Sequence, residues 1–127
     1  MRRRISLTSI FLVASGAILF SRGYKEMRQV RNMPINEVDL SGVPDGSYKG
    51  DFTYGKFTYE VEAAVKDHRI ENIGILKNRD TKHAKKAEGV IENVLKAQSL
   101  DVDTVTGATT TSKALLKAIE NALKTSL

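Results

Sequence analysis

The sequence has 127 residues, 41% hydrophobic and 28% charged, which fits one ordinary globular domain with a tail and excludes a disordered or collagen-like chain. It contains no cysteine, which excludes disulfide frameworks, cysteine-ligated zinc, iron–sulfur clusters and c-type haem. The net charge is +5, but residues 1–31 carry seven basic residues and one acid (+6), and the remainder carries 13 Lys and Arg against 14 Asp and Glu (−1). Because the expected domain itself is not basic, we expect no binding to nucleic acid.

The chain begins with a basic cluster, Arg2–Arg4, followed by Ile5–Phe20, which contains no charged residue. As a helix this run would span about 24 Å. That is short of the ~30 Å hydrocarbon core, but flanking arginines can extend to the headgroups. We therefore predict a signal-anchor transmembrane segment over residues 1–20, at the cell membrane, and an extracytoplasmic location for residues 21–127. The alternative is a cleaved signal peptide and a secreted protein; the absence of a clean A-x-A site before a polar stretch favours the anchor.

Residues 21–46 sustain neither a helical nor a strand period, and glycines and prolines interrupt them. We predict that they form a tether. A folded domain is then expected over residues 47–127.

The first part of this domain has the pattern of strands. Apolar and polar residues alternate over residues 57–65, which predicts a strand with one buried face. Apolar residues near 52–54 and 70–76 predict a strand on either side, and residues 67–69 form a short polar turn. These segments predict an antiparallel meander.

The period then becomes helical, with apolar residues on one face from about Thr81 to Gln98 and again from about Ser112. Asp80 or Thr81 is the expected cap of the first of these helices. Strands followed by helices indicate an α+β fold, in which a small antiparallel sheet has two helices packed on one face and a membrane helix precedes the domain.

The stretch between the two predicted helices, residues 101–113, carries the chemistry. Six of the nine residues from Thr104 to Ser112 have hydroxyl groups, and Gly107 lies among them. A structural explanation is sufficient for this composition, because Thr and Ser cap helices and loops before helices are often rich in them. The same residues also suit an anion, since the first N–H groups of a helix are unpaired and Lys113 adds charge. No Walker spacing occurs, so nucleotide hydrolysis is not supported.

The segment Asp103–Thr109, DTVTGAT, resembles the D-x-x-[ST]-G-A-[TS] motif of FMN-binding domains. Such domains occur in the C and G subunits of sodium-pumping NADH:quinone oxidoreductase and of Rnf-type complexes, and as small stand-alone exported proteins. Two weaker similarities lie upstream, at Asp45–Gly50 and Val65–Ile70, where His68 replaces the usual turn glycine. The resemblance covers residues 45–127.

The resemblance implies that FMN is covalently linked, through its phosphate, to Thr109. A flavin transferase would make the bond in trans, because a threonine hydroxyl is a poor nucleophile without an activating base. Thr110 and Thr111 are close chemical competitors of Thr109. The residues expected to bind the cofactor are Asp103, Thr106, Gly107, Ala108, Thr109, Thr111 and Ser112. We expect no catalytic residue and no metal site, because His68 and His83 lack partner ligands at metal-binding spacing.

The sequence thus suggests a membrane-anchored, extracytoplasmic flavoprotein in electron transfer, without substrate chemistry of its own. Its expected partners are the transferase, the membrane, and membrane redox proteins or the subunits of a complex. One alternative is a non-covalent module that binds or senses FMN or another phosphorylated ligand. Another is an adaptor subunit of a membrane complex, in which the loop before the last helix is merely structural.

Overall fold

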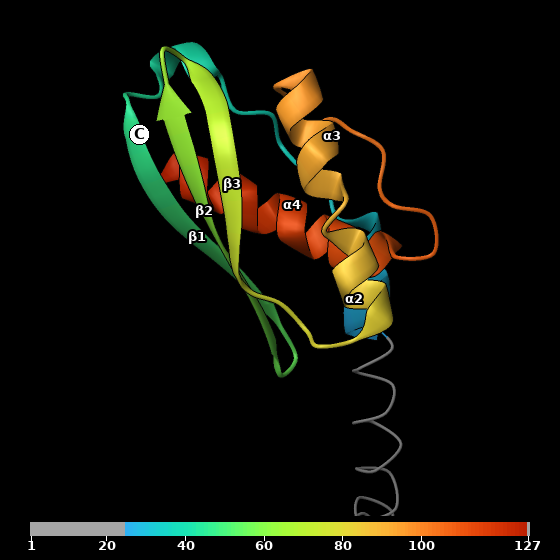
Figure 1. Cartoon of the computed structure of the whole chain (residues 1–127). Helices are drawn as coiled ribbons and strands as arrows, with labels where there is room; N and C mark the ends of the chain where they lie inside the picture. The colour runs from blue at the N-terminus through green and yellow to red at the C-terminus, as the bar shows by residue number, and fades with distance from the viewer. Residues whose placement is uncertain (1–24, 127) are drawn as a thin grey trace, which may run out of the picture.

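The sheet is the meander that the alternation predicted. The structure is a computed structural model that describes residues 25–126, so the predicted membrane segment over residues 1–20 lies outside the described residues. The strands β1 (Gly46–Tyr54), β2 (Phe57–Lys66) and β3 (Arg69–Lys77) pair antiparallel in the order β1-β2-β3 (Figure 1). In the part of the chain that is described, no helix has the length and apolar character needed to cross a membrane.

The central strand β2 supplies the sheet's contribution to the core. Alternate residues of β2, Tyr59, Val61, Ala63 and Val65, are buried, whereas the residues between them are partly exposed. This confirms the predicted buried face. The turn after β2 places Asp67 and His68 at φ +51° and +60°, so two non-glycine residues adopt the left-handed conformation that two-residue hairpin loops require.

The helical part differs from the prediction in two places. The single helix expected over residues 81–98 is two helices, α2 (Lys82–Ala87) and α3 (Val90–Ala97), because i→i+3 bonds end α2 and Gly89 at the junction favours helix poorly. Thr81 caps α2 by accepting a hydrogen bond from the Ala84 N–H at 3.1 Å, one of the two caps expected. The last helix, α4 (Thr109–Lys124), begins three residues before Ser112, because its first turn consists of threonines that carry no apolar period.

The helix α4 lies directly on β1 and β2, with its first residues next to α2 (Figure 1). Gly50 of β1 makes this close approach possible. A Cβ added at Gly50 would overlap the backbone nitrogen of Ala122 and the carbonyl oxygen of Ala118, both in α4. The helix contributes small residues at the contact, and its larger apolar side chains, Leu115, Leu116, Ile119 and Leu123, are fully buried nearby.

The segment before the sheet is packed on the domain over most of its described length. Residues 25–32 are helical, which the sequence pattern did not predict, and a 3-10 turn follows at Leu40–Gly42. Val30 and Val43 are buried in the core. The carboxylate of Glu37 accepts hydrogen bonds from the Ser99 hydroxyl at 2.6 Å and the Leu100 N–H at 2.7 Å. Two buried apolar residues in a polar segment give too little periodicity to be recognised as an element.

Glu120, on α4, fastens this segment to the helix. Its carboxylate is fully buried, accepts the Asn36 N–H at 2.7 Å, and pairs with Lys117 at 3.0 Å and Lys124 at 2.7 Å. Burial alone would raise the pKa of Glu120, but the hydrogen bonds from Lys124, Asn36 and Lys117 outweigh it and hold the pKa below its ordinary value. The ionised form is therefore the one that the fold stabilises.

The Gly50 contact predicts a severe effect of one methyl group. Gly50→Ala should lower the free energy of unfolding by more than about 3 kcal/mol, because the new Cβ meets helix backbone that cannot move aside. Gly74→Ala is the matched control in β3, where an added Cβ has no neighbour within 4 Å. Urea unfolding of both variants measures the effect, and equal losses would contradict the close approach.

The Glu120 network predicts a pH dependence. Because the folded pKa is lowered, its contribution to stability is complete above the unfolded pKa and is lost as the pH falls through the folded pKa. Glu120→Gln should cost about 2 kcal/mol at pH 7, since charge-assisted hydrogen bonds disappear. It should also flatten the fall in stability between pH 5 and pH 3, roughly the range where a carboxyl group titrates. The urea midpoints of the wild type and of Glu120→Gln, measured between pH 5 and pH 3, test this prediction. An equally steep fall in stability with pH in the variant would contradict it.

Candidate functional site

The loop that joins α3 to α4 is folded back on the first turn of α4. The hydroxyl oxygen of Ser112 accepts the Val105 N–H at 3.1 Å, and the Ala108 N–H donates to the Val105 carbonyl at 2.9 Å. Gly107 takes φ +79°, a left-handed conformation that costs glycine little. Ser112 is fully buried. The hydroxyl of Ser112 therefore holds the loop against the first turn of α4 from inside the core.

The N-terminus of α4 has the features of an anion site. Among the described residues no side chain caps the helix, whose N-cap is Ala108. The first N–H groups of α4 are therefore available, and the dipole of a 16-residue helix favours negative charge there. Thr109 and Thr110 are half-buried on this turn.

A cavity of about 360 Å³ opens at this helix end. Segments far apart in the sequence surround it: the helix at residues 25–32, the end of β1, the loop after β3, and α2. The residues that line the cavity are Met27, Arg31, Tyr54, Arg79, His83, Gly107, Ala108, Thr109, Thr110 and Thr111. Two guanidinium groups, from Arg31 and Arg79, thus stand at the cavity beside free N–H groups and hydroxyls. This donor set matches a phosphate group, because arginine pairs with phosphate oxygens and helix N-termini bind them.

The structure brings together some of the predicted site residues and leaves others apart. Gly107, Ala108, Thr109 and Thr111 line the cavity, whereas Asp103 and Thr106 are exposed and do not line it. The Asp103 carbonyl instead accepts a hydrogen bond from the Asn93 side chain at 3.3 Å.

Lys113, which the sequence suggested as an added charge, donates to the Met33 carbonyl at 3.2 Å and does not line the cavity. The positive charge at the cavity comes from Arg31 and Arg79, which the sequence pattern did not indicate. Neither lies near the motif in sequence, and only the fold brings them to it.

Two stacked tyrosines of the sheet, Tyr54 and Tyr59, lie at the cavity, and Tyr54 lines it. The rings of Tyr54 and Tyr59 are stacked with their centroids 5.9 Å apart. The guanidinium carbon of Arg79 lies 3.8 Å from the centroid of the Phe57 ring. Tyr59 is buried, and this burial, together with its hydrogen bond to Tyr54, raises the pKa of Tyr59 far above its ordinary value. The Tyr59 hydroxyl donates a hydrogen bond to the Tyr54 hydroxyl at 3.4 Å. Tyr59 is therefore neutral at physiological pH.

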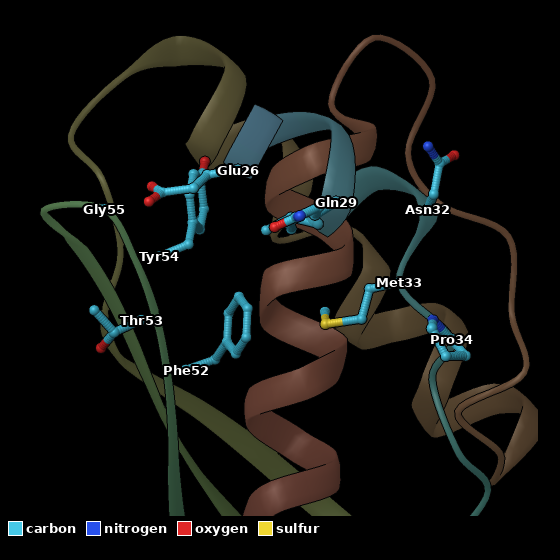
Figure 2. A pocket seen from close by; sticks show the side chains of 10 residues that line it. Glu26, Gln29, Asn32, Met33, Pro34, Phe52, Thr53, Tyr54 and Gly55 are labelled. Carbon is cyan, nitrogen blue, oxygen red and sulfur yellow. The ribbon is translucent and has the colours of Figure 1, made fainter. Parts of the chain in front are cut away.

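A second cavity, of about 650 Å³, shares the lining residue Tyr54 with the first. Figure 2 shows the side chains that line this second cavity. One wall is residues 26–34, and the other is the end of β1 with the turn at Gly55. Phe52 and Met33 face each other across it in Figure 2, with Gln29 near Tyr54.

Comparison with protein families gives one result for this chain. The model of the FMN-binding domain matches residues 54–124, more than half of the chain, and the protein therefore belongs to the FMN-binding domain family. A comparison with curated proteins gives no match. The donor set at α4 fits the phosphate of FMN. Residues 25–53, which supply Met27, Arg31 and most of the second cavity, precede the matched region.

Proposed function

We propose that this protein is a membrane-anchored, extracytoplasmic electron-transfer flavoprotein that carries FMN covalently linked through its phosphate to Thr109. The observation that carries this proposal is the start of α4, where hydroxyl groups and uncapped N–H groups open into a cavity that Arg31 and Arg79 also line. Membership of the FMN-binding domain family supports the identity of the cofactor.

The hydrogen bonds of the motif favour particular hydroxyls as the acceptor. The hydroxyl of Ser112 is fully buried and accepts a hydrogen bond from the Val105 N–H, and Thr111 is buried, at 7% exposed. Thr109 and Thr110 remain, both half-buried at the cavity. Thr109 directly follows Gly107 and Ala108, as the motif of the resembling domains requires, and is our choice.

Attachment at Thr109 needs a transferase. The Thr109 hydroxyl would form a bond to the phosphorus of an activated flavin nucleotide, the hydroxyl proton would pass to a base of the transferase, and the donor's leaving group would depart. This chain supplies the acceptor hydroxyl, while Arg31, Arg79 and the first N–H groups of α4 hold the negative charge of the resulting phosphodiester.

Bound FMN supplies one- and two-electron redox chemistry, so the protein's own residues need only bind, orient and shield it. Covalent attachment suits an exported carrier, because a dissociable cofactor would be lost from the cell surface. The membrane anchor has a further consequence. Met27 and Arg31 follow Phe20 by seven and 11 residues, so an anchor ending there would keep the flavin site near the membrane and its redox partners.

The alternative of a non-covalent FMN-binding or sensory module uses the same cavity without the bond to Thr109. It differs in one measurable respect, since its flavin would separate from the chain on denaturation. An adaptor subunit without flavin would contain no flavin either before or after denaturation.

The acceptor assignment predicts a contrast between two adjacent threonines. After co-expression with a flavin transferase, the wild type should gain the mass of one covalent FMN, Thr109→Ala should gain none, and Thr110→Ala should be largely loaded. Asp103→Ala should be loaded less, through weaker recognition by the transferase. Intact mass and peptide mapping measure these outcomes. An adduct on Thr106, Thr110 or Thr111 would contradict the assignment, and no adduct on any variant would leave the non-covalent module.

The anchor predicts a topology. We fuse, after Leu127 of the full-length protein, a reporter that is active only outside the cytoplasm. The fusion should be active, and it should sediment with membranes. A reporter that is active only in the cytoplasm should stay silent at the same position. The reverse pattern would contradict the orientation, and activity in the culture medium would indicate cleavage and secretion.

A further inference from the structure

We propose that the cavity between residues 26–34 and the end of β1 receives the isoalloxazine ring of FMN, so that the segment before the sheet forms one wall of the flavin site. This inference rests on the proposed function, because it takes the flavin phosphate to be held at the start of α4. It adds a ring site built largely from residues that precede the matched family region.

The position of the cavity is the first argument. Tyr54 lines both this cavity and the smaller one at α4, so the two adjoin at that side chain. The proposal places the flavin phosphate in the smaller cavity and the flat ring in the larger one. The two cavities measure about 360 and 650 Å³, and the two arginines line only the smaller one.

The chemistry of the walls is the second argument. Phe52 and Tyr54 supply aromatic faces from β1, and Val30, Met33 and Pro34 supply apolar surface from the opposite segment. Aromatic and thioether side chains are favourable neighbours of a flat conjugated ring. A flavin ring also has an edge of carbonyl and N–H groups, which needs donors and acceptors. Gln29 offers both in one side chain, and Figure 2 shows it between Tyr54 and Met33.

The wall contributed by residues 26–34 is held firmly enough to form part of a site. Val30 is only 4% exposed and lies in the core cluster. The Met33 carbonyl accepts a hydrogen bond from the Lys113 ammonium, and the Asn36 N–H donates a hydrogen bond to the buried carboxylate of Glu120. Both partners lie on α4, the helix that starts at Thr109. The start of α4 would thus hold the flavin phosphate, and residues 26–34, which are bonded to α4, would contact the flavin ring.

Blocking the larger cavity tests the ring site separately from attachment. Gln29→Trp fills the cavity from an exposed position on the helix at residues 25–32. Asn72→Trp is the matched control, since it adds an indole at an exposed position in another cavity of about 650 Å³, lined by residues of β3 and α3. Full-length proteins are loaded by the transferase, and intact mass confirms attachment in each.

The readouts are flavin fluorescence and its collisional quenching by iodide. In Gln29→Trp the covalent flavin should become about threefold or more accessible to iodide, because a ligand pocket buries ~70–90% of its ligand's surface. Asn72→Trp should match the wild type. Phe52→Ala, which removes an aromatic wall without filling space, should also raise accessibility, and thermal melts confirm that each variant is folded. Equal quenching in all four proteins would overturn the proposal.

Failure of the proposed function gives a different result. If the wild type gains no flavin mass, the covalent assignment is wrong and the ring site is tested with riboflavin, which has the ring but no phosphate. Unloaded wild type and Asn72→Trp should quench riboflavin fluorescence by the same amount in a titration, and Gln29→Trp should quench it measurably less. Quenching that is the same for all three chains, or absent from the wild type, would overturn the ring site.

Discussion

The close contact between Gly50 and α4 is the constraint on which the rest of this structure depends. A helix normally rests on a sheet through a layer of side chains, but here the backbone of β1 meets the helix at Ala118 and Ala122. Because the helix and strand backbones touch, their distance is fixed by hard atomic contacts rather than by adaptable side chains. The position of α4 along the sheet then decides where its first turn lies, next to α2 and the end of β1.

Side chains near the two ends of α4 hydrogen-bond two other segments of the chain. At the N-terminus, Ser112 holds the loop through Val105, and the motif residues present N–H and hydroxyl groups to the cavity. Nearer the C-terminus, Glu120 binds Asn36 and so fixes the segment that precedes the sheet. One helix thereby positions both the hydroxyl groups at its own start and the segment that carries Arg31. The buried carboxylate is costly to desolvate, and the lysines and the N–H that it binds offset this cost.

The site itself shows why a motif alone does not describe a binding site. The motif provides the hydroxyls and the helix start, both local in sequence. The guanidinium groups of Arg31 and Arg79 come from segments 78 and 30 residues before Thr109, and Tyr54 comes from the end of a strand.

The sequence by itself determined the strands and their buried face, since alternation from Phe57 to Val65 leaves only one face for the core. It also determined the family, because seven consecutive residues, Asp103–Thr109, carry the motif. It did not determine the break between α2 and α3 or the start of α4, since Gly89 and the threonines interrupt or lack an apolar period. The tertiary structure alone decided that Met33 and Asn36 bond to α4 and that two distant arginines reach the cavity. Such contacts depend on three-dimensional proximity between segments whose own local patterns are weak, and periodicity along the chain contains no record of it.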